Sequence, residues 1–133
     1  MSMKEKLTIG KLAEAANVNI ETIRFYERKE LIKQPQKTGS FRTYSDDYVQ
    51  RVIFIRRAQE LGFSLAEIGE LLALRIKKAS KCSDVLERAE QKIAEIDLKI
   101  KDLKRMKKSL KGLADCCEDT SLPLSECPIL DCF

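Results

Sequence analysis

The stretch LTIGKLAEAANVNIETIRFYER, residues 7–28, decides the fold. Its apolar residues recur at helical spacing in two short segments, Ile9–Ala16 and Ile20–Arg28. In the second segment, Ile20 and Ile23 are expected to face inward. Thr8 and Asn19 stand just before these segments, where a side-chain oxygen can cap a helix. Asn17, between the two segments, suits a turn position with left-handed backbone conformation. Two short helices joined in this way are typical of a helix-turn-helix.

The second predicted helix carries candidate DNA-contacting side chains. Its expected outward residues are Thr22, Arg24, Tyr26 and Arg28. Hydroxyl and guanidinium groups of this kind bind phosphates and base edges when a helix lies in the major groove. A solvated basic helix would show the same residues, so this helix alone does not decide the function.

The segment after this helix predicts a wing. Leu31–Pro35 and Lys37–Tyr44 indicate two short strands around a glycine-containing turn. A basic hairpin directly after a recognition helix is placed to contact the flanking DNA backbone. We expect Arg42 and Tyr44 to make its phosphate contacts, and the helix pair and hairpin together favour DNA binding.

A second helix pair is expected next. Ser45 can cap a helix that runs to about Leu61, and Ser64 with Glu67 forms a capping box for the helix that follows. Most apolar residues of this pair are expected to be core residues.

The apolar residues from 82 to 114 follow a seven-residue period. The two sets of this period are Cys82, Ala89, Ile96, Leu103 and Leu110, and Leu86, Ile93, Ile100 and Ala114, with Lys107 as the break. A helix with one narrow apolar stripe needs a partner helix. Since the chain offers no second helix of matching length, we expect a homodimeric coiled coil.

Five cysteines and no histidine narrow the possible chemistry. A continuous helix from Cys82 to Cys116 spans roughly 50 Å at about 1.5 Å per residue, so one chain cannot bring Cys82 to Cys117. An antiparallel pair of helices can, and it would carry two equivalent sites. Three thiolates, from Cys82, Cys117 and Cys127, suit soft ions such as Hg(II), Cd(II) or Pb(II), and Zn(II) with a fourth ligand.

Two other classes of function stay open at this point. An odd cysteine count argues against a disulfide framework, but a redox sensor could oxidise Cys116 with Cys117, or Cys127 with Cys132. An enzyme for metal transfer or thiol exchange is the third class, although the sequence shows no convincing nucleophile–base pair. The net charge of +4 permits a nucleic-acid partner. No apolar run reaches the length of a membrane span, and the segment Met1–Lys6 lacks the apolar core of a secretory signal, so we expect a cytoplasmic protein.

The chain resembles the MerR family of metal-responsive regulators over nearly its full length. The resemblance lies in residues 7–13 (LTIGKLA), 21–28 (ETIRFYER), 41–44 (FRTY) and 61–68 (LGFSLAEI). It implies a dimer that binds promoter DNA, represses without effector and, with effector, distorts the DNA so that RNA polymerase can start. The mercury-responsive members resemble this chain most, and their three ligand cysteines match Cys82, Cys117 and Cys127.

The expected fold is mainly α: a winged helix-turn-helix with a second helix pair, a long antiparallel coiled-coil helix and a metal-binding loop. The corresponding expected boundaries are 1–75 for the DNA-binding part, 76–81 for a linker, 82–115 for the dimerisation helix and 116–133 for the loop and tail. The expected function is transcriptional regulation rather than catalysis, with Hg(II) as effector and Zn(II), Cd(II) or Pb(II) as alternatives.

Overall fold

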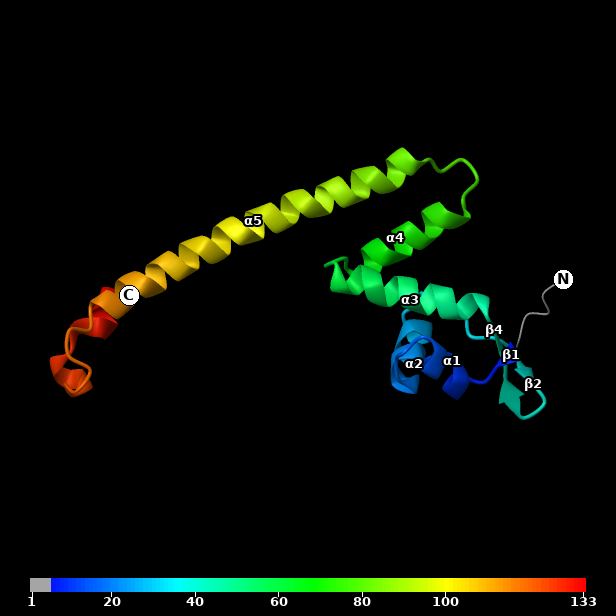
Figure 1. Cartoon of the computed structure of the whole chain (residues 1–133), viewed down its shortest axis with the longest axis horizontal. Helices are drawn as coiled ribbons and strands as arrows, with labels where there is room; N and C mark the ends of the chain where they lie inside the picture. Colours follow the sequence, from blue (N-terminus) through cyan, green and yellow to red (C-terminus); the bar gives the residue numbers. More distant parts are fainter. Residues whose placement is uncertain (1–5) are drawn as a thin grey trace. The chain divides into compact units, whose positions relative to one another are not determined.

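A computed structural model describes residues 6–133 and is shown in Figure 1. In chain order its elements are β1 (Lys6–Leu7), α1 (Ile9–Ala15), α2 (Ile20–Arg28), β2 (Lys37–Thr38), β3 (Phe41–Arg42), β4 (Tyr44–Ser45), α3 (Asp47–Glu60), α4 (Leu65–Ile76), α5 (Cys82–Asp115), η1 (Leu124–Glu126) and η2 (Pro128–Cys132). The chain divides into two compact units, up to Leu86 and from Glu87 onward. The segment Met1–Lys6 was the basis for expecting no secretory signal. Of this segment, only Lys6 lies within the described residues.

The predicted helix-turn-helix is present, with the predicted caps. Thr8 Oγ1 accepts a hydrogen bond from the Lys11 N–H at 3.3 Å, and Asn19 Oδ1 accepts one from the Thr22 N–H at 2.8 Å. These bonds satisfy amide groups that a helix start leaves without an intrahelical partner. Asn17 has a φ of 56°, the left-handed conformation expected of the turn. Helix α1 ends one residue before the predicted boundary.

The wing hairpin is shorter than predicted. Strands β2 and β3 pair antiparallel around a turn in which Gly39 has a φ of 74°. Leu31 and Ile32 are not in a strand but are buried, because their side chains complete the core after α2. A second pairing was not predicted: β1 pairs antiparallel with β4 and ties the start of the described chain to the segment before α3.

The second helix pair is α3 and α4. The capping box at the start of α4 is confirmed, because Ser64 Oγ accepts from the Glu67 N–H at 3.1 Å and Glu67 Oε1 accepts from the Ser64 N–H at 2.8 Å. The predicted Ser45 cap is wrong. Ser45 lies in β4, paired with Lys6, and Asp46 occupies the cap position of α3 without a side-chain bond.

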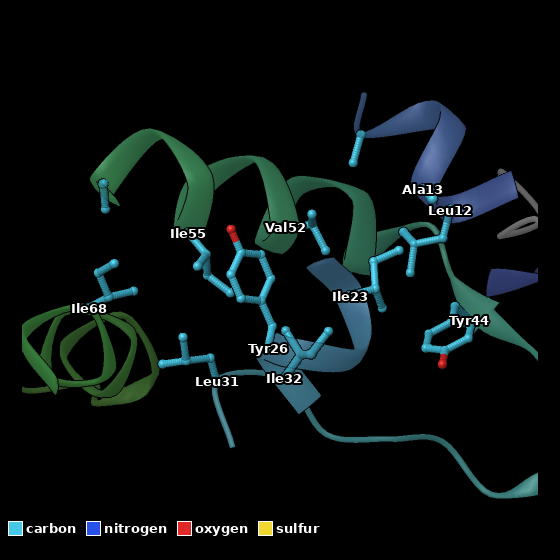
Figure 2. Close-up of a cluster of buried hydrophobic side chains, with 12 residues drawn as sticks. Leu12, Ala13, Ile23, Tyr26, Leu31, Ile32, Tyr44, Val52, Ile55 and Ile68 are labelled. Atoms are coloured by element: carbon cyan, nitrogen blue, oxygen red, sulfur yellow. The ribbon is translucent and has the colours of Figure 1, made fainter. Parts of the chain in front are cut away.

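The core of the first unit lies between α1, α2, α3 and α4 (Figure 2). Its largest fully buried side chains are Tyr26, Tyr44, Leu12, Ile23, Ile32, Ile55, Ile68 and Val52. Ile23 is buried as predicted, whereas Ile20, expected to face inward, is 37% exposed. Its place in the first turn of α2 leaves it at the edge of the packed face.

Helix α5 is 34 residues long and leaves its predicted apolar seam uncovered. Exposed apolar side chains of the two heptad sets include Leu86, Ile93, Ile96, Ile100, Leu103 and Leu110. A helix with such a stripe is stabilised when another helix covers it. None of the helices in residues 6–133 combines the length and the apolar character needed to cross a membrane.

Candidate nucleic-acid interface and thiol pair

The outer face of α2 presents two arginines. Arg24 is exposed and its Nη1 lies 3.4 Å from Glu21 Oε1, a weak surface pair that a phosphate could replace. Arg28 is also exposed, with its guanidinium carbon 6.0 Å from the centre of the Phe25 ring. Thr22 is half-buried and its hydroxyl donates to Asn19 Oδ1 at 2.8 Å. Guanidinium groups held on one helix face can bind phosphates and guanine edges.

Tyr26 does not lie on the outer face of α2, where the sequence analysis placed it. Its side chain is 1% exposed, and Figure 2 shows its ring among the aliphatic side chains of the core. Its hydroxyl donates to Gln59 Oε1 on α3 at 2.7 Å. The apolar ring favours burial and the hydroxyl finds a partner at the core edge, as is common for tyrosine. Tyr26 therefore holds α2 against α3.

Tyr44 is also a core residue, although it was expected to contact phosphate. It is 1% exposed, and its hydroxyl donates to Glu27 Oε2 at 3.1 Å. Its ring meets the Tyr48 ring edge-on, with centroids 5.2 Å apart. Burial, and then the negative charge of Glu27, raise the pKa of Tyr44 to about 12. The hydroxyl therefore stays protonated and links the strand after the wing to α2.

Arg42 lies on the wing itself and is not fully buried. It is half-buried in β3, and its Nε donates to the Pro35 carbonyl oxygen at 3.1 Å. That bond fixes one side of the guanidinium, so its outer nitrogens can face a ligand in a defined direction. Arg42 and Arg24 both line a small depression of about 160 Å³ between α2 and the wing.

Two further residues of this unit were missed by the sequence analysis. Arg56 Nη1 donates to the carbonyl oxygen of Asn17 in the turn, and Gln59 accepts from Tyr26. Both line an open depression of about 500 Å³ beside the turn and the start of α2. Their spacing of three residues on one helix was the available signal, because it places them on the same face.

The second unit brings Cys117 and Cys127 together. Both thiols are free and half-buried, and they are close enough to share a hydrogen bond. Desolvation raises the pKa of the Cys117 thiol, and the hydrogen bond and charge of Cys127 raise it further. The backbone N–H of Asp119 acts in the opposite direction and lowers this pKa. Two adjacent thiols with an N–H donor form a site that a soft cation can enter by displacing protons.

The loop around this thiol pair is shaped by Asp119. Its Oδ1 accepts from the Ser121 N–H at 2.9 Å and from the Ser121 hydroxyl at 2.6 Å, and these bonds lower the pKa of the Asp119 carboxyl. A carboxylate that bonds the backbone two residues later holds a tight turn. The turn begins the path from Cys117 back to Cys127.

A disulfide joins Cys116 and Cys132, with their Cα atoms 6.7 Å apart. The odd cysteine count argued against a disulfide framework, and the structure nevertheless contains this disulfide within the chain. The redox alternative also named other pairs, Cys116 with Cys117 and Cys127 with Cys132. Neither pair is bonded, because the chain turns back after η1 and brings the last cysteine to the end of α5.

Cys82 stands apart from this pair along the chain. It is exposed at the first residue of α5, whereas Cys117 lies beyond the last residue of that helix. Over residues 6–133, no three Cys, Asp or Glu side chains of one chain gather into a group that could hold a metal ion. The structure thus brings two of the three predicted ligands together within the chain and not the third.

Known proteins are similar to this chain over both of its compact units. A family model for the MerR HTH family regulatory protein matches residues 7–74, and one for MerR, DNA binding, matches residues 49–113. The mercuric resistance operon regulatory protein of Bacillus cereus is 43% identical over 127 residues, covering 95% of this chain and 96% of that protein.

Two solved structures are similar over most of the chain. The mercury(II) complex of a dual-function MerR regulator from Bacillus megaterium MB1 has 41% sequence identity and a TM-score of 0.70, and the match covers 94% of this chain and 97% of that one. The lead(II) complex of a transcription regulator from Ralstonia metallidurans CH34 has 33% identity and a TM-score of 0.85, with the same coverage. The similar proteins are thus regulators, and two of them are seen with soft divalent ions.

Proposed function

Because the chain belongs to the MerR family of metal-responsive transcriptional regulators, we propose that mercury(II) is its effector and that a homodimer binds promoter DNA. Without the ion the dimer represses. With the ion it distorts the promoter so that RNA polymerase can start transcription, a form of control through DNA shape. The observation that carries the metal assignment is the pair of free, half-buried thiols of Cys117 and Cys127, which lie within hydrogen-bonding reach in one loop.

The DNA contacts are assigned to the polar groups that remain accessible. Arg24 and Arg28 on α2 bind base edges or phosphates, with Thr22 at the start of the helix and Arg42 on the wing. Tyr26 and Tyr44 act indirectly, because their hydroxyls bond to Gln59 and Glu27 and so position α2. This assignment separates residues that touch DNA from residues that hold the touching helix in place.

The metal site is assigned to Cys117 and Cys127 of one copy and Cys82 of the second copy. Two observations support a shared site. The exposed apolar seam of α5 calls for a second helix, and an antiparallel pair sets the start of one helix beside the end of the other. Over the roughly 50 Å of a helix of this length, no single chain can supply all three thiolates while the helix is continuous.

The ligand chemistry favours mercury(II) over the alternatives. Three thiolates bind a soft ion well, and zinc(II) usually requires a fourth ligand, for which this chain offers no histidine. Cadmium(II) and lead(II) also accept three thiolates. Because similar proteins are seen with lead(II) and with mercury(II), both ions are included in the test below.

A competition titration of the reduced dimer with Hg(II), Pb(II), Cd(II) and Zn(II) tests the effector. Mercury(II) is expected to bind most tightly and to trigger transcription in vitro at the lowest concentration. Cys117→Ser and Cys127→Ser should each abolish the response and leave DNA binding intact. Under reducing conditions Cys132→Ser is the matched control and should respond normally. A zinc(II) response at lower concentration than mercury(II) would contradict the assignment.

Mixing two variants tests whether the site is shared. A Cys82→Ser subunit is exchanged with a Cys117→Ser/Cys127→Ser subunit, so that each heterodimer holds one complete three-thiolate site. The mixture should show a three-thiolate charge-transfer band that neither homodimer shows. If heterodimers form and the band is absent, the shared site is wrong.

A further inference from the structure

The disulfide between Cys116 and Cys132 encloses the proposed ligands without being one of them. It joins positions separated by 16 in the sequence, and both Cys117 and Cys127 lie between them. Cys116 directly precedes one of these thiols, and Cys132 follows shortly after the other. The three cysteines that stay free are Cys82, Cys117 and Cys127, which are the three proposed ligands.

Packing contributes little to holding the C-terminal tail near the end of α5. No residue from 116 to 133 is buried, and Leu130 and Phe133 are 58% and 84% exposed. The two short helices of the tail, η1 and η2, lie against each other, but they form no apolar core. The covalent bond is therefore the main tie between the tail and the segment that begins with Cys116.

We propose that Cys116 and Cys132 form a reversible disulfide, called the clasp below, whose closure tightens metal binding by Cys117 and Cys127. Hydrogen peroxide closes the clasp, and a thiol reductant opens it. This inference rests on the proposed function, because it concerns regulation of the same loop. On closing, the two thiols lose two protons and two electrons and form one S–S bond. The O–O bond of hydrogen peroxide breaks, and these protons and electrons leave in two water molecules. On opening, a reductant thiolate attacks one sulfur, and the reductant leaves as its own disulfide.

The effect on metal binding follows from chain entropy. With the clasp open, Cys117 and Cys127 are connected only through the chain between them, and metal binding must order that chain. The closed clasp adds a second connection around the outside, through the Cys116–Cys132 bond. The two thiols then have fewer ways to separate, so less freedom is lost when a metal ion binds both. We expect about tenfold tighter binding in the closed form, a change typical of such preorganisation.

A cadmium(II) titration of the full-length dimer in two redox states tests the clasp. One sample is treated with one equivalent of hydrogen peroxide per chain and the other with a phosphine reductant, and both are desalted without oxygen. Alkylation and mass spectrometry then map the bonds. The peroxide-treated sample should contain the Cys116–Cys132 bond and alkylated Cys82, Cys117 and Cys127. Its cadmium affinity, read from the thiolate charge-transfer band against a competing chelator, should be about tenfold tighter than that of the reduced sample.

Cys116→Ser and Cys132→Ser are matched controls, because each removes the clasp and leaves the three proposed ligands. Each should bind cadmium equally after reduction and after one equivalent of peroxide, with the affinity of the reduced parent chain. A bond between Cys117 and Cys127 in the parent chain, or equal affinities in its two redox states, would overturn the clasp. Absence of the charge-transfer band from both redox states would instead contradict the proposed metal site, so the two failures are distinct.

Discussion

The two compact units of the chain differ in where their apolar side chains lie. In the first unit, up to Leu86, twelve apolar residues form a buried core between four helices. In residues 87–133, all of which are described, the one buried residue is Lys92, which pairs with Glu95 at 2.7 Å. The apolar residues of α5 in this unit face outward instead.

This difference separates two sources of stability. The first unit removes apolar surface from water within one chain, the dominant favourable contribution to folding. The second unit leaves most of its apolar side chains exposed in one chain, so in the proposed dimer its stability should depend on protein concentration. A residue's contribution should therefore be measured by unfolding in the first unit and by association in the second.

Ile55→Ala should produce the largest change, because it opens a cavity in the core of the first unit. Ile55 is fully buried on α3, and such truncations cost about 2–5 kcal/mol in the free energy of unfolding. Ile53→Ala is the matched control on the same helix, because Ile53 is 42% exposed, and it should cost less than about 1 kcal/mol. Denaturant unfolding at fixed protein concentration measures both. Equal losses would show that the core is placed wrongly.

Ile100→Asp should weaken the dimer about 100-fold, since it places a charge in the seam of both helices. Leu98→Asp is the matched control: Leu98 is also apolar and exposed on α5 but lies off both heptad sets. Sedimentation equilibrium of the two variants measures their dissociation constants. If Leu98→Asp weakens association as much as Ile100→Asp does, the seam assignment is wrong.

Arg24→Ala should reduce promoter affinity about tenfold at physiological salt and lower the salt dependence by about one counterion. Its stability should hardly change, since the ion pair with Glu21 is exposed. Arg105→Ala is the matched control, because Arg105 pairs with Asp102 at the same spacing but lies on α5. Fluorescence anisotropy with promoter DNA at several salt concentrations tests both variants. An equal loss in the two would argue against a recognition role for α2.

Tyr44→Phe should have the smallest effect, a loss of about 1 kcal/mol in the free energy of unfolding, because it removes the hydrogen bond to Glu27. It should also change the alkaline pH dependence. The folded-state pKa of Tyr44, about 12, lies above the unfolded value of about 10, so this group stabilises the fold below pH 10 and less as pH rises toward 12. Unfolding between pH 9 and pH 11.5 should show a steeper decline for the parent chain than for the variant. Parallel declines would contradict the raised pKa.

Local signals in the sequence predicted the local structure well. Thr8, Asn19 and Ser64 cap the helices they were expected to cap, because each bond spans only three residues. Ser45 failed as a cap because Lys6 pairs with it, and two-residue strands leave no periodic pattern in the sequence. The heptad from Cys82 was visible because it repeats over the full length of α5.

The site was only partly predictable for a related reason. Tyr26 and Tyr44 can face either water or core, and the choice depends on Gln59 and Glu27, which are distant in sequence. Likewise, the pairing of Cys116 with Cys132 depends on how the tail turns back through η1 and η2. Cys117 and Cys127 were named together because of their separation along the loop and the family resemblance, and their role as ligands stays a prediction.

The length of α5 sets a rule for insertions and deletions. Each added residue turns everything beyond it by about 100° around the helix axis and moves it about 1.5 Å along that axis. A single-residue deletion near Arg105 would therefore turn the cysteine loop by about 100° relative to the part of the seam that precedes the deletion. Changes of whole heptads keep the heptad register and change this angle little, so in the proposed dimer length variants of α5 should retain metal response in steps of about seven residues.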